Sequence, residues 1–141
     1  WSGHMADTPQ AGQLIAKARR ALASARVLFD DHDFDGACNR AYYAMFLSAE
    51  AAVLKVGHEP PRTHRGLLIM FARELVTSGR VDPDLGRQLH RAAQLRNVAD
   101  YTGDQVRKDH TQSLLAAAET FVRDISSTFA LGDFWADGDG N

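Results

Sequence analysis

The histidine, cysteine and carboxylate side chains of this sequence do not fall at the intervals that hold a metal ion. The only cysteine, Cys38, has no histidine or second cysteine at a zinc-binding distance along the chain. A single cysteine also excludes a disulfide within the chain. We therefore expect no metal and no other cofactor, and a reducing, cytoplasmic compartment is the simplest interpretation.

Arg96 and Asp100 stand four residues apart, which places them on one face of a helix. Such a pair contributes about 0.2–0.5 kcal/mol, but an arginine that precedes its aspartate is the less favourable order. This order favours a role for Arg96 and Asp100 beyond their mutual attraction. His64 belongs to the residue type that titrates near neutral pH. It can approach Arg96 only if two helix ends, or two subunits, converge.

Length and composition indicate one ordinary globular domain. The chain has 141 residues, of which 45% are hydrophobic and 24% charged. The formal net charge of −2 gives no general attraction to nucleic acid, so any RNA contact must come from a local group of basic residues. The longest clear apolar run, residues 66–72, is too short to span a membrane, and we expect no membrane association. Residues 1–4 look like a cloning scar that precedes a natural start at Met5.

Apolar residues recur at helical intervals nearly throughout, and the sequence between them is rich in cap and turn residues. The pair Asp82-Pro83, for example, is a strong start signal for a helix. We predict an all-α fold, an antiparallel bundle of about five helices, over residues 5–131. Residues 132–141, rich in Gly and Asp, are predicted to form a flexible tail. The predicted helices cover residues 10–31, 33 or 35 to 57, 63–79, 82–102, and 109 or 111 to 129.

Three segments resemble a known family when they are taken together and in order. They are Asn39–Phe46 (NRAYYAMF), Thr63–Gly66 (THRG) and Leu95–Tyr101 (LRNVADY). The chain resembles the HEPN family, in the group of short HEPN proteins that is associated with toxin–antitoxin loci. The resemblance implies an antiparallel helical bundle that is usually a homodimer. It also implies a cognate toxin or antitoxin as partner, and this partner can be a nucleotidyltransferase.

The sequence departs from the family at one position that matters for chemistry. Active HEPN ribonucleases carry an arginine, four to six residues, and then a histidine. Arg96 stands at the position of that arginine, but residues 101–103 contain no histidine. Arg26 and His32 have a permitted spacing, yet about one or two such matches are expected by chance, and this pair ends the predicted first helix.

Metal-independent RNA cleavage uses the neighbouring 2′-hydroxyl as nucleophile and needs a base, an acid and a cation for the phosphate charge. Arg96 can supply the cation, because a guanidinium binds phosphate through two hydrogen bonds. Asp100 and His64 are the candidates for the titrating group. The residues that we expect to contact RNA are Arg40, Arg65 and Tyr101.

Each candidate also has a structural interpretation. Tyr42 and Tyr43 are more typical of core and interface aromatics than of base-stacking platforms. Arg40 fits a residue at the edge of the core whose guanidinium binds a carboxylate such as that of Asp100. His64 fits a hydrogen-bonding residue at a helix start. The arginines at positions 19, 20 and 26 fit a solvated helix face.

Two functions remain open on the sequence alone. The missing histidine favours a regulatory module that binds a partner protein and retains a degenerate ribonuclease site. The alternative is a toxin-type, metal-independent endoribonuclease with an altered active site. Because no histidine follows Arg96 at the spacing of the active ribonucleases, the sequence favours the first function over the second.

Overall fold

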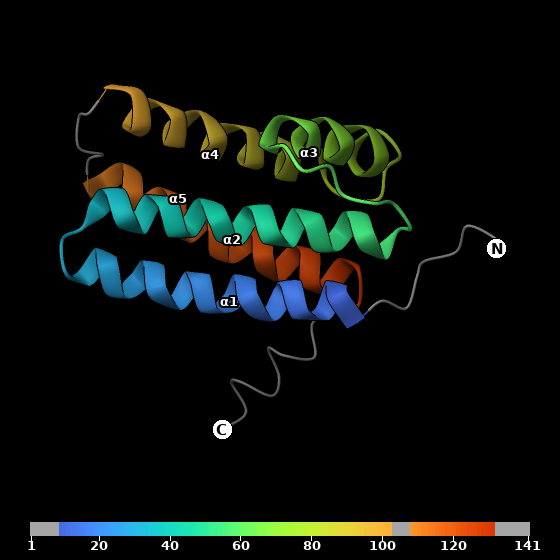
Figure 1. The fold of residues 1–141 in the computed structure, drawn as a ribbon, viewed down its shortest axis with the longest axis horizontal. Helices are drawn as coiled ribbons and strands as arrows, with labels where there is room; N and C mark the ends of the chain where they lie inside the picture. The colour runs from blue at the N-terminus through green and yellow to red at the C-terminus, as the bar shows by residue number, and fades with distance from the viewer. Residues whose placement is uncertain (1–8, 103–107, 132–141) are drawn as a thin grey trace.

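The computed structural model describes the backbone of residues 9–102 and 108–131, and the side chains of these residues except 97–102. No strand occurs in this part of the chain, and the predicted all-α bundle of about five helices is confirmed (Figure 1). The predicted scar at residues 1–4 and the predicted tail at residues 132–141 lie outside the described residues. The elements are α1 (Pro9–Asp30), α2 (Phe34–Lys55), α3 (His64–Phe71), η1 (Ala72–Val76), α4 (Pro83–Thr102) and α5 (Lys108–Thr128).

Helix α2 is the central element of the bundle. It packs against α1, α3, α4 and α5, and Figure 1 shows it between α1 on one side and α3 with α4 on the other. All six alanines of α2 are fully buried. Their small side chains let the neighbouring helices approach closely, since the distance between packed helices depends on the side chains at the contact. Residues on α2 can therefore meet side chains from several other helices.

The caps and turn residues of the sequence set most helix boundaries. Of the two predicted caps for the second helix, Asp33 is the one used, because its Oδ1 accepts a hydrogen bond from the backbone N–H of Gly36 at 2.9 Å. The last helix begins at Lys108, one residue before the predicted Asp109. No helix in the described part of the chain is both long and apolar enough to cross a membrane.

The predicted third helix changes its hydrogen-bond pattern before it ends. Regular α-helix stops at Phe71, and η1 follows as a short π-helix, in which the N–H of Thr77 donates to the carbonyl of Ala72 five residues back at 2.8 Å. The chain then turns at Gly79, whose φ of 82° suits glycine. The sequence pattern did not reveal this π-helix, because apolar spacings of three and four residues fit both kinds of turn.

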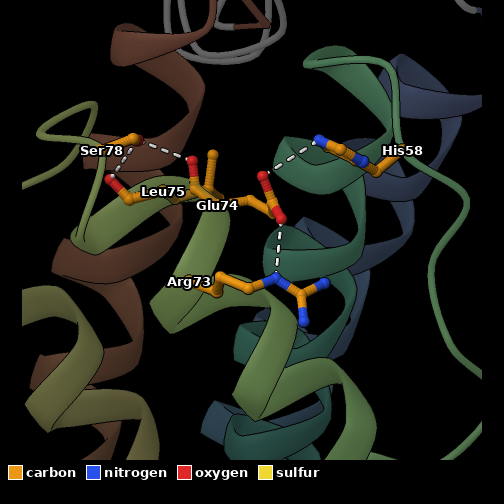
Figure 2. A network of polar contacts seen from close by, with 5 residues as sticks. All are labelled: His58, Arg73, Glu74, Leu75 and Ser78. Atoms are coloured by element: carbon orange, nitrogen blue, oxygen red, sulfur yellow. Dashed lines mark hydrogen bonds and ion pairs between the residues drawn. The ribbon is translucent and has the colours of Figure 1, made fainter.

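A group of polar contacts fixes η1 to the loop that follows α2 (Figure 2). Nε2 of His58 lies 3.3 Å from Oε1 of Glu74, while Nε of Arg73 donates to Oε2 of the same carboxylate at 2.7 Å. The hydrogen bond from Arg73 is the main cause that lowers the pKa of Glu74. Ser78 donates to the Glu74 backbone carbonyl at 2.6 Å. Both carboxylate oxygens of Glu74 therefore have a partner, and the loop is held against the π-helix.

Candidate functional site

His64 owes its position to the cap of α3. Thr63 has an extended backbone (φ −93°, ψ 150°), and its hydroxyl accepts a hydrogen bond from the N–H of Gly66 at 3.0 Å. A side chain at Gly66 would not fit, since a Cβ there would lie 2.7 Å from the Thr63 hydroxyl and 2.9 Å from Cβ of Pro61. The cap and this close approach make His64 the first residue of α3.

The imidazole of His64 meets side chains from α2 and α4. Its Nδ1 lies 3.3 Å from Nη1 of Arg96 and 3.3 Å from the hydroxyl of Tyr42. The His64 ring also packs against the ring of Phe46, with centroids 4.3 Å apart. The structure therefore brings together His64 and Arg96, which are 32 residues apart in the sequence. This is the convergence of helix ends that any joint role of the two residues requires.

Arg96 is held by α2 and keeps its positive charge available. Its Nε donates to Oδ1 of Asn39 at 3.1 Å, and its guanidinium lies 5.3 Å from the centroid of the Tyr42 ring. Neither partner carries a negative charge. Among the residues whose side chains are described, no carboxylate forms an ion pair with Arg96. A half-buried guanidinium with neutral partners is suited to binding an anion such as phosphate.

The protonation of His64 follows from these neighbours. Partial burial lowers the pKa of His64, and the positive charge of Arg96 lowers it further. A guanidinium can only donate hydrogen bonds, so Nδ1 is the acceptor in the contact with Arg96. The imidazole is then neutral and carries its proton on Nε2. Burial raises the pKa of Tyr42, although Arg96 opposes that effect, so the hydroxyl keeps its proton.

Arg40 packs against an aromatic ring of its own helix, α2. Its guanidinium lies 4.5 Å from the centroid of the Tyr43 ring, and Nζ of Lys17 lies 6.0 Å from the same centroid. The predicted pairing with the Asp100 carboxylate falls on a side chain outside the described residues, as does any role of Tyr101. Arg65 is exposed, next to His64 on α3.

Sequence reasoning missed Asn39 and Phe46 as members of the cluster. The amide oxygen of Asn39 accepts a hydrogen bond from Nε of Arg96. Positions 39, 42 and 46 are three and four residues apart, and this spacing on one helix face was the signal that could have grouped them. Tyr42 is buried as predicted, while its hydroxyl also contacts His64.

The described side chains of this cluster include no cysteine and no carboxylate. In the described part of the chain, no three His, Cys, Asp or Glu side chains come close enough to hold a metal ion together. The groups that the cluster does contain are a cation, a neutral imidazole, a phenol and an amide. These groups suit metal-independent acid–base chemistry on an anionic substrate.

Comparison with known proteins agrees with the resemblance found in the sequence. The HEPN domain family matches residues 11–127. A "UPF0332 protein" of Gloeobacter violaceus is 33% identical over 118 residues, which cover 82% of this chain and 93% of that protein. Two proteins of Methanocaldococcus jannaschii, each named "Putative toxin", are 36% and 31% identical. Their alignments cover 77% and 78% of this chain, and 81% and 75% of the two relatives.

Proposed function

The chain belongs to the HEPN family, and from this premise we propose that it is a toxin-type endoribonuclease that cleaves RNA without a metal ion. The toxin names of two relatives support the general role. One observation carries the chemistry: Nδ1 of His64 lies 3.3 Å from Nη1 of Arg96. His64, supplied by α3, takes the place of the histidine that is missing after Arg96. This proposal reverses the preference that the sequence alone gave.

The proposed reaction is an internal attack within the RNA strand. Arg96 binds the non-bridging oxygens of the phosphate, and neutral His64 accepts the proton of the 2′-hydroxyl. The bond from the 2′-oxygen to phosphorus forms as the bond from phosphorus to the 5′-oxygen breaks. The leaving 5′-oxygen takes a proton from water, and the hydroxide that remains takes the proton from His64, which returns to its neutral form. The products are a 2′,3′-cyclic phosphate and a free 5′-hydroxyl.

Tyr42 gives His64 a way to change its tautomer when substrate binds. In the free protein, Nδ1 accepts a hydrogen bond from Arg96. Once Arg96 turns its donors to the phosphate, Nδ1 can carry the proton and donate a hydrogen bond to the oxygen of the Tyr42 hydroxyl, 3.3 Å away. The lone pair of Nε2 is then free to act as the base. Tyr42 is a positioning residue in this scheme, because it acts through the imidazole.

Expression of the protein alone tests the proposal. We expect the wild type to arrest growth and to degrade total RNA in vitro. Arg96→Ala should lose both effects, with cleavage reduced about 10²–10³-fold, as when one group that stabilises transition-state charge is removed. Arg80→Ala is the matched control, because Arg80 is exposed and lies before α4, away from the cluster.

Two outcomes contradict a metal-independent nuclease. The first is that pure wild-type protein leaves RNA intact, and the second is that a chelator abolishes cleavage. If the wild type leaves RNA intact and also permits growth, the regulatory module that the sequence favoured becomes the better description.

A second candidate role, the binding of another subunit, is supported by the surface of α4. Two grooves, of about 530 and 420 Å³, flank this helix and are lined mainly by apolar surface. Arg91 and Gln94 line both of them. We propose that α4 forms the homodimer interface, and that a cognate protein, such as a nucleotidyltransferase antitoxin, acts on this dimer in the cytoplasm. Sedimentation should give a dimer at micromolar concentration, and Arg91→Glu should shift it to monomer. A wild-type monomer would contradict this interface.

A further inference from the structure

A groove of about 580 Å³ lies between α1 and α5, apart from the His64 cluster. The described residues that line it include four arginines, three from α1 and one from α5, and one carboxylate, Glu119. The sequence suggested only a solvated helix face here, because the spacing of arginines along α1 cannot show that residues of α5 lie opposite them. The four arginines are Arg19, Arg20, Arg26 and Arg123.

The groove concentrates positive charge in a chain whose formal net charge is −2. Four arginines against one glutamate leave a formal excess of three positive charges along its walls. Glu119 forms an ion pair with Arg26. Arg20 and Arg123 form no ion pair with any described side chain. Like charges held close together repel one another, and an anion in the groove relieves that repulsion.

The positions of the arginines suit an extended anion. On α1 they occupy residues 19, 20 and 26, so their stripe is about 10 Å long at 1.5 Å per residue. Arg123 faces this stripe from α5, one helical turn after Glu119. A stripe of this length is long enough to contact neighbouring phosphates along one nucleic-acid strand. The cations thus form two walls along a short track.

We propose that this groove binds the phosphate backbone of the RNA substrate, an inference that rests on the proposed ribonuclease function. Arginine is the cation best suited to phosphate, because its planar donors match two phosphate oxygens. The floor is made of small or buried residues such as Ala16, Leu22 and Ala23. An acidic peptide would need an apolar anchor to bind tightly, whereas the large side chains that line this groove are mostly arginines.

The groove and the His64 cluster lie in different parts of the bundle. Figure 1 shows α3 and α4 along one side and α1 along the other, with α2 between them. An RNA that contacts both His64 and the arginines must therefore pass around the bundle. A dinucleotide can occupy only one of the two places. The groove should consequently favour long substrates without taking part in the reaction.

The salt dependence of RNA binding measures how much the arginines of the groove contribute to affinity. We expect the double variant Arg20→Ala/Arg123→Ala to bind a long single-stranded RNA more weakly in fluorescence anisotropy. The slope of log affinity against log salt should fall by about 1.4, since each phosphate contact in a single strand contributes about 0.7. In cleavage assays, KM for long RNA should rise, while kcat and KM for a dinucleotide stay unchanged. The double variant Arg62→Ala/Arg80→Ala, at exposed arginines outside the groove, is the control.

A gain-of-function variant removes any ambiguity about folding. Glu119→Gln removes the one carboxylate among the described residues that line the groove, and it frees Arg26. RNA should then bind more tightly and with a steeper salt slope. Unchanged affinity and slope in both variants would overturn the proposal. So would competition by poly-glutamate as effective as that by RNA, because it would identify an acidic polypeptide as the ligand. Failure of the groove is separate from failure of the nuclease, since anisotropy reports binding even if no RNA is cleaved.

Discussion

His58 lies in the loop between α2 and α3, His64 begins α3 six residues later, and the two histidines contact groups of opposite charge. His58 contacts the carboxylate of Glu74, which Arg73 also binds (Figure 2). His64 contacts the guanidinium of Arg96, which has only neutral partners among the described side chains. One group of contacts balances its charges and the other does not.

The difference separates a structural role from a chemical one. At Glu74 the contacts with a cation lower the pKa of the carboxyl group, and its charge is satisfied within the protein. At His64 burial and a neighbouring cation lower the pKa of the imidazole, so it stays neutral beside a positive charge. A neutral base next to an unpaired cation is suited to an anionic substrate, whereas a balanced ion pair fixes a loop.

The largest expected difference between the two regions is in RNA cleavage. His64→Ala should lower kcat/KM about 10²–10⁴-fold, the range typical of losing a general base. His58→Ala should leave cleavage unchanged, because its contact with Glu74 only fastens the loop to η1. Steady-state assays with both variants test this comparison. Equal losses in the two variants would show that the loop as a whole, and not the His64 imidazole, is required.

A smaller effect is expected from the caps of two helices. Thr63→Ala and Asp33→Ala each remove an N-cap hydrogen bond and should each cost about 1 kcal/mol of unfolding free energy. Only Thr63 positions His64, so only Thr63→Ala should also lower the cleavage rate. Denaturant unfolding and cleavage assays provide the two readouts. Activity that follows stability equally in both variants would argue against a positioning role for the cap.

The smallest effect concerns the pKa of His64. Arg96→Gln should raise that pKa, since it removes one of the two causes of the shift, but burial should keep it below 6.5. NMR titration of the imidazole measures this change, with Arg80→Gln as the control variant. A His64 pKa that stays constant in Arg96→Gln would mean that the contact at 3.3 Å does not persist in solution.

The free energy of unfolding should fall with decreasing pH in two separate ranges, one set by His64 and one by Glu74. The folded state binds the His64 proton less readily than the unfolded chain, so stability falls as pH drops below about 6.5 towards the lowered pKa. The pKa of Glu74 is lowered too. Its contribution to stability is fully present above pH 4.5 and is lost only as the pH falls through the lowered pKa of the folded state. Arg96→Gln should reduce the first loss and leave the second unchanged.

The fold was predictable because its signals are local. Apolar spacing, the Asp33 and Thr63 caps, and the Asp82-Pro83 start each act within one or two helical turns. The π-helix at 72–76 was not predictable, because its apolar spacing also fits an α-helix. The same limit applies to the arginine groove, because Glu119 and Arg123 reach it from a helix about 100 residues further along the chain.

The sequence by itself determined the helices, their order and the identity of Arg96 as a candidate cation. Only the tertiary structure decided that His64 would stand beside Arg96 and that Asn39, not a described carboxylate, would hold the guanidinium. The physical reason is that a pKa depends on burial and on charges within a few ångströms. Those distances are set by how α2, α3 and α4 pack, and packing joins residues that no spacing along the chain connects.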